Sequence, residues 1–195
     1  MSRWVFALVV AAIVGSCGVR DTDAPRNLDN ACSILEQRNG YAAAFRATER
    51  KWGVPVHVQM AIIYQESKFK SNARPPFQYR LGVIPMGRQS SAVGYSQALD
   101  GTWEEYKEET GRSSANRTNV RHASDFMGWY MNGTKNELGI PLTDTRRQYL
   151  AYHDGRAGYR RGTYRSKAWL MRIAGELEQR AARYRVQLAN CRAAR

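Results

Sequence analysis

The sequence predicts a mainly α-helical fold: one compact helical domain over residues 29–195, with a single long irregular loop. The chain has 195 residues, which suits one domain with a sizeable core. Several segments repeat apolar residues every three or four positions, and no alternating strand pattern competes with them. Residues 67–93 lack this period and contain three prolines. We expect a loop there, with room for a short β-hairpin over 79–87.

Capping and helix-breaking residues divide the first part of the domain into three helices. Asp29 or Asn30 can cap the first helix. Gly40 separates it from the second, and Gly53 ends the second. Pro55 suits the first turn of the third helix. The expected ranges are 31–38, 41–52 and 55–67.

After the loop the chain returns to helices. Gly111 closes the first of them, and Gly155 ends the third, which Thr143 or Thr145 can cap. The expected ranges are 102–110, 117–131, 143–152 and 166–191. We assign Trp103 and Trp129 to the core, and with them an apolar stripe on the last helix: Trp169, Ile173, Leu177, Ala181, Tyr184 and Leu188.

Lysine and arginine outnumber aspartate and glutamate by 30 to 17, which gives a net charge of +13. Such a surplus favours polyanionic partners: nucleic acid, anionic lipid or an acidic polymer. An export signal conflicts with a nucleic-acid partner, and the N-terminus has the features of one.

The first residues, MSRWVFALVVAAIVGSCG, combine one cation, an apolar run over 4–14 and then small residues. The run is short for a membrane span and is typical of a secretory signal peptide over 1–16. Its end resembles a bacterial lipobox, which implies a lipid on Cys17 and a tether over 17–28. Gly18 then favours the outer membrane, with the domain facing the periplasm. The alternative is an ordinary signal peptide with Cys17 as an incidental thiol.

Without Cys17, two cysteines remain. An exported chain meets an oxidising compartment, so Cys32 and Cys191 are expected to form a disulfide that ties the first helix to the last. The alternative is a pair of buried free thiols. His57 and the other two histidines lack metal-ligand spacing, so we expect neither a metal site nor a cofactor.

Glu66 is the first candidate for catalysis. It shares a face of the third helix with Ile62 and Ile63 and lies near the C-terminal end, where backbone carbonyls carry partial negative charge. Burial and this dipole both raise the pKa of a carboxyl group. A glutamic acid that stays protonated near neutral pH can act as a general acid. The alternative is a surface glutamate at a helix end.

Two further motifs follow in order: GYSQA at 94–98 and AYHDG at 151–155. With the Glu66-Ser67 helix end they resemble the lytic transglycosylases of the lysozyme-like fold. That family has Glu-Ser, then Gly-x-x-Gln, then Ala-Tyr-Asn-x-Gly. The resemblance covers about residues 40–165. It implies a lysozyme-like domain in which the irregular loop covers an active-site cleft.

The resemblance implies that Glu66 is the catalytic acid and base. It would protonate the bond between N-acetylmuramic acid and N-acetylglucosamine in peptidoglycan, and the muramic acid hydroxyl would close a 1,6-anhydro ring. One alternative is a muramidase that uses water. Another is a non-catalytic peptidoglycan-binding lipoprotein with the same fold. We expect a monomer.

The resemblance also implies a substrate site. Gln97 would hold the acetamido group of the sugar, Tyr95 and Ser96 would line the cleft beside Gly94, and Tyr152 would point towards Glu66. His153 replaces the usual asparagine and would make the same polar contact. Ser67 would bond to the acid or to substrate. Phe69, Phe77 and Tyr79 would stack on sugars, and rim cations would meet peptide carboxylates: Lys68, Lys70, Arg74 and Arg80.

Overall fold

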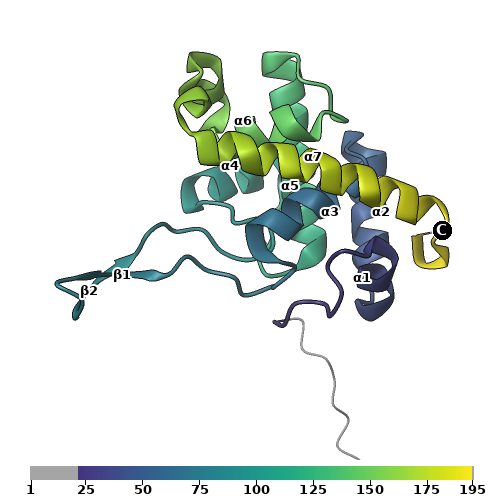
Figure 1. The fold of residues 1–195 in the computed structure, drawn as a ribbon, viewed down its shortest axis with the longest axis horizontal. Coiled ribbons are helices and arrows are strands. Elements are labelled where there is room, and N and C mark those ends of the chain that lie inside the picture. Colours follow the sequence, from purple (N-terminus) through teal and green to yellow (C-terminus); the bar gives the residue numbers. More distant parts are fainter. Residues whose placement is uncertain (1–21, 195) are drawn as a thin grey trace, which may run out of the picture.

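The computed structural model describes residues 22–194 and confirms the mainly α-helical fold (Figure 1). The α-helices are α1 (Ala31–Gln37), α2 (Tyr41–Trp52), α3 (Val56–Ser67), α4 (Asp100–Thr110), α5 (Val120–Leu138), α6 (Thr145–Arg161) and α7 (Ala168–Ala189). Two 3-10 helices, η1 (Thr163–Ser166) and η2 (Arg192–Ala194), flank α7. Two strands, β1 (Phe77–Arg80) and β2 (Ile84–Arg88), form a hairpin. The predicted signal peptide and Cys17 lie outside the described residues.

The centre of the domain is α3, which contacts α2, α5, α6 and α7. Its residues from Val58 to Ile63 are fully buried because apolar side chains point outwards around the whole helix. One polar residue is included: Gln59 donates to the carbonyls of Phe45 and Val54, at 3.0 and 2.7 Å, and accepts from Ser124 at 2.7 Å. Because its amide is satisfied, Gln59 can lie in the core and fix the packing of α2 and α5 on α3.

Several helix ends differ from the sequence-based expectation. Asn30 caps α1, as one of the two expected residues, but Asp144 caps α6 in place of Thr143 or Thr145. Gly155 does not end α6: it makes a kink with φ 74° and ψ 156°, and the helix continues to Arg161. Likewise, α5 continues seven residues beyond 131. Both extensions provide packing surface that local helix signals do not specify.

The two ends of the domain are tied together. Cys32 and Cys191 form the predicted disulfide between α1 and the residues after α7. Residues 22–28, expected to be part of a tether, lie against the domain: the carbonyl of Leu28 accepts hydrogen bonds from Arg180 and Tyr184. None of the helices within residues 22–194 is long and apolar enough to cross a membrane.

The predicted loop contains the hairpin, which is antiparallel and projects from the helical body (Figure 1). Phe69, expected beside the cleft, is instead fully buried in the core at the start of the loop. Trp169, expected in the core, is 49% exposed at the start of α7. Its ring lies edge-on to His153, at 5.2 Å between centroids.

Candidate active site

Glu66 lies in the last turn of α3, where the helix stops abruptly. The next two residues after Ser67, Lys68 and Phe69, both have positive φ, at 52° and 61°, although neither is glycine. The amide of Lys68 donates to the carbonyl of Tyr64 at 3.1 Å and closes the helix. Positive φ at residues other than glycine persists only where the surrounding packing holds the backbone in place. Such conformations cluster at functional sites.

The carboxyl group of Glu66 is in an environment that favours its neutral form. Burial raises its pKa to about 8, and the nearby ammonium of Lys68 only partly opposes the shift. Ile62 and Ile63, one turn earlier on the same face, are fully buried. Within residues 22–194, no group donates a hydrogen bond to this carboxyl. The burial of Glu66 therefore favours its protonated form at neutral pH.

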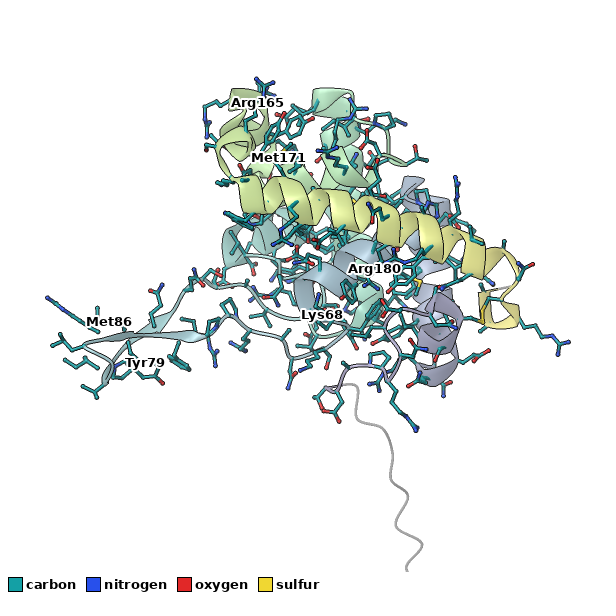
Figure 2. All side chains as sticks on the ribbon, in the orientation of Figure 1. Lys68, Tyr79, Met86, Arg165, Met171 and Arg180 are labelled. Atoms are coloured by element: carbon teal, nitrogen blue, oxygen red, sulfur yellow. A yellow bond between two sulfur atoms is a disulfide. The ribbon has the colours of Figure 1, made fainter. Side chains whose placement is uncertain are left out.

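Lys68 is held beside Glu66 by aromatic packing. Its ammonium lies 3.6 Å from the ring centroid of Tyr64, and the guanidinium of Arg180 lies 3.5 Å from the same centroid. Figure 2 labels both cations. Burial and Arg180 lower the pKa of Lys68, while Glu66 opposes that shift. The ammonium of Lys68 thus interacts with the ring of Tyr64 as well as with Glu66.

The third motif lies on α6, and this helix brings two tyrosines near Glu66: Tyr152 of the motif and Tyr149. Burial raises the pKa values of Tyr152 and Tyr149, and the charge of Glu66 raises both further. The hydroxyl of Tyr152 donates to the carbonyl of Ser96 at 2.6 Å, so it links α6 to the second motif. Tyr149 was not among the predicted site residues. Its position one turn before Tyr152 was the available signal.

The second motif forms a tight turn between Val93 and Ala98, which pair through a β-bridge. A Cβ atom on Gly94 would lie 2.2 Å from the carbonyl oxygen of Arg117, so only glycine fits there. Gln97 has φ 48°, and its side-chain nitrogen donates to the carbonyls of Ala73 and Gly94 at 3.0 and 2.8 Å. The amide oxygen of Gln97 remains available to a ligand.

Three predicted contact residues lie behind the surface of the site. Tyr95 is 1% exposed, and its hydroxyl accepts from that of Tyr41 at 2.9 Å, so its ring lies in the core and not along a cleft. Ser96 is also buried, and its hydroxyl oxygen has no hydrogen-bond partner in the described part of the chain. Ser67 donates back to the carbonyl of Ile63 at 3.2 Å. Tertiary packing, not the motif spacing, decided these positions.

His153 and Asp154 form a cluster at the kink of α6. The side chain of Asp154 is 1% exposed, yet it accepts hydrogen bonds from Lys167 at 2.7 Å and Thr163 at 2.7 Å, and contacts Nδ1 of His153 at 3.0 Å. Burial alone would raise its pKa, but these hydrogen bonds lower it to about 2. Asp154 is therefore ionised and joins α6 to η1 and α7.

A cavity of about 260 Å³ lies between the second and third motifs. Its lining residues include Gln97, Tyr130, Tyr152, His153 and Gly155. A more open cavity of about 710 Å³ lies near Arg74, Arg88 and Arg117, and neither cavity is lined by Glu66. The smaller one is the candidate site, because Tyr152, which lines it, is near enough to Glu66 for an ionised Glu66 to raise its pKa. No cluster of three or more His, Cys, Asp or Glu residues that could hold a metal occurs within residues 22–194.

Nearly the whole chain also matches a known family. A sequence model of the transglycosylase SLT domain matches residues 5–191. Among the curated proteins compared with the chain, none matches it. The match covers all three motifs and nearly all of the sequence, and it supports peptidoglycan lytic transglycosylase activity in general and a lysozyme-like fold. The chain belongs to the transglycosylase SLT domain family.

Proposed function

We propose that this chain cleaves the bond between N-acetylmuramic acid and N-acetylglucosamine in peptidoglycan and leaves a 1,6-anhydro sugar end. The observation that carries this proposal is the position of Glu66 at the end of α3: burial raises the pKa of its carboxyl to about 8, and Tyr152 of the third motif lies near it. A general acid must hold a proton at working pH and release it to the leaving oxygen.

In the first step Glu66 donates its proton to the glycosidic oxygen. The bond from that oxygen to the anomeric carbon of the muramic acid breaks, and positive charge develops on the sugar ring. In the second step the primary hydroxyl of the same sugar attacks the anomeric carbon, and the Glu66 carboxylate takes the hydroxyl proton. Glu66 ends as it began, and proton transfer of this kind contributes about 100- to 10,000-fold.

The other acids near the site support this route over hydrolysis through a second carboxylate. Glycosidases that use two acids need one on each side of the bond. Asp154 is buried and occupied by Lys167 and Thr163. Asp100 pairs with Arg117 at 2.7 Å at the start of α4. An internal hydroxyl nucleophile requires neither of them.

We assign direct sugar contacts to Gln97, Tyr152 and His153, which line the smaller cavity. The amide oxygen of Gln97 can accept from the N–H of an acetamido group. Gly94 and Ser96 act indirectly: the first allows the close turn, and the carbonyl of the second fixes Tyr152. Tyr95 and Ser67 support the site from the core.

Family membership supports a substrate in the cell envelope. The further proposal of a lipid on Cys17 and an outer-membrane location facing the periplasm rests on the sequence, because these residues lie outside those described. Mass spectrometry of the processed N-terminus would test it: a lipid-modified Cys17 at the new N-terminus is expected, and an unmodified Cys17 would contradict it.

The function is tested by digesting purified peptidoglycan sacculi and weighing the released fragments. Ends lighter by one water than reducing ends are expected, because no water enters the reaction. Reducing ends would indicate a muramidase and would overturn the anhydro product.

A pair of variants completes this test. Glu66→Gln should release no fragments above background, whereas Glu178→Gln, which changes an exposed acid on α7, should act as the parent chain does. If the Glu66 variant clears sacculi as fast as the parent, cleavage does not depend on Glu66 and its proposed role is wrong.

A further inference from the structure

We propose that the hairpin β1–β2 inserts its tip into the interfacial layer of an anionic lipid bilayer. The hairpin carries six large apolar residues that are about half exposed or more: Phe77, Tyr79, Leu81, Val83, Ile84 and Met86. The turn between the strands is the most exposed part, with Leu81 at 85% and Val83 at 76%. Contiguous exposed apolar surface of this kind marks a binding site for a partner or a membrane.

The hairpin receives almost no support from the rest of the domain. All four residues of β1 and four of the five in β2 are exposed, so neither face packs on the helices. Figure 2 shows Tyr79 and Met86 near its end, well away from the helical body. A two-stranded hairpin without a covered face is marginally stable in water. We therefore expect another molecule to cover the apolar side chains of the hairpin.

The charge of this segment specifies an anionic partner. Between Glu66 and Asp100 the sequence contains no acidic residue. Over the same stretch it contains five cations: Lys68, Lys70, Arg74, Arg80 and Arg88. Two of them, Arg80 and Arg88, lie on the hairpin itself. Cations beside an apolar tip match a bilayer, where phosphate groups lie just outside the hydrocarbon.

The distribution of apolar side chains favours a bilayer over a protein or a glycan. A protein partner presents one surface, but apolar residues point to both faces of this hairpin and around its turn. A fluid layer can surround such a tip on every side. A glycan needs hydrogen-bonding groups beside stacked rings, whereas the end of the hairpin is mostly aliphatic: Leu81, Val83, Ile84 and Met86.

The unpaired strand edges limit how deep the hairpin can go. Backbone groups without partners are costly in the hydrocarbon core, so the strands must stay at headgroup level while the turn side chains enter the acyl boundary. Arg88 is fixed at the base, stacked 4.3 Å from the ring centroid of Phe77 and bonded to the carbonyl of Pro75. Arg80, beside the turn, is left to meet phosphates.

The test is hydrogen exchange measured by mass spectrometry on the full chain, with and without vesicles. Vesicles of phosphatidylethanolamine with phosphatidylglycerol should slow exchange over residues 77–88 by roughly tenfold, and vesicles of phosphatidylcholine alone should not. Because the readout is local, it separates the hairpin from any membrane contact made by the N-terminal segment. It also requires no catalysis, so it stands apart from the proposed function.

Two matched pairs of variants sharpen the test. The double change Leu81→Ser with Val83→Ser should remove the slowing, while Val186→Ser, at an exposed valine on α7, should leave it intact. Arg80→Gln should reduce the slowing severalfold, since each cation at an anionic surface contributes about a factor of five. Arg172→Gln, at an exposed arginine on α7, should not reduce it.

Every other outcome contradicts the proposal. Unchanged exchange on both kinds of vesicle would mean that the tip does not insert. Equal slowing of exchange on phosphatidylcholine vesicles would show that the hairpin does not require anionic lipid. Slowing that requires purified glycan strands would assign the hairpin to substrate, and slowing that grows with protein concentration alone would assign it to a second copy of the chain.

Discussion

Two carboxyl groups on different helices, Glu66 at the end of α3 and Asp154 at the kink of α6, have opposite electrostatic states. Both are removed from water to a large degree, and burial raises the pKa of each. The pKa of Glu66 is about 8, while that of Asp154 is about 2. The difference comes from hydrogen-bond donors, which Asp154 has in Lys167 and Thr163 and Glu66 lacks among residues 22–194.

This comparison shows that burial alone does not make a general acid. A buried carboxyl with donors becomes a fixed anion that holds elements together, as Asp125 also does with Tyr106, Trp52 and Lys51. A buried carboxyl without donors keeps its proton and can give it to a substrate.

The largest expected effect is on the pH dependence of cleavage. Since protonated Glu66 is the proposed acid, kcat/KM should fall about tenfold per pH unit above pH 8. Initial rates on soluble glycan strands between pH 5 and 10 would measure this. A decline that begins near pH 5 would mean that Glu66 ionises normally and that its site is as polar as that of Asp154.

The next effect concerns stability, through Glu66→Gln. The folded pKa of Glu66 lies above its unfolded value, so wild-type stability falls as pH rises from about 4.5 to 8. The variant has no proton to lose and should gain roughly 1–4 kcal/mol in unfolding free energy at pH 9. Urea unfolding should show no such gain at pH 4. A loss of stability at pH 9 would indicate that the carboxylate has partners.

Asp154→Asn should act in the opposite direction. Its folded pKa is depressed, so its contribution is present above pH 4 and is lost as pH falls towards 2. Removing the charge weakens the bonds from Lys167 and Thr163 and should lower the unfolding free energy at pH 7 by about 1–3 kcal/mol. Asp144→Asn, at a more exposed acid, is a suitable control. Equal losses of unfolding free energy in the two variants would mean that the hydrogen bonds to Asp154 add no special stability.

The smallest effect is expected for Lys68→Gln. The cation of Lys68 lowers the pKa of Glu66, so its removal should move the alkaline limit of activity upwards by less than about one pH unit. Lys70→Gln removes an exposed cation from the next turn of the chain and should leave that limit unchanged. An unchanged limit in the Lys68 variant would mean that this lysine does not interact with Glu66, and a downward shift would contradict the predicted sign.

Much of the fold could be predicted from the sequence, because its signals are local. Asn30, Gly53 and Gly111 mark helix ends where the structure has them. The prediction that Gly155 ends α6 was wrong. A glycine can either end a helix or kink a longer one, and here the packing of α6 on α7 favours the longer, kinked helix. The prediction that Trp169 lies in the core was wrong, because the apolar period of α7 does not show where the other helices stop covering that face.

The site could be predicted less completely. The order of the three motifs predicted Glu66, Gln97 and Tyr152 as site residues; in the fold Gln97 and Tyr152 line one cavity, and Tyr152 lies near Glu66. Tyr95 could not be placed, because the left-handed turn at Gly94 rotates its ring into the core. Nor could the partners of Asp154, since Lys167 is thirteen residues away and reaches it only through the turn before α7.

The central claim is that Glu66 is neutral at working pH, and carboxyl carbon NMR of the folded chain tests it most directly. With glutamate labelled at the side-chain carboxyl carbon, and the Glu66→Gln variant used to assign the signal, the chemical shift of Glu66 should titrate with a midpoint near 8. A midpoint between about 4 and 5, like that of an exposed glutamate, would contradict the account.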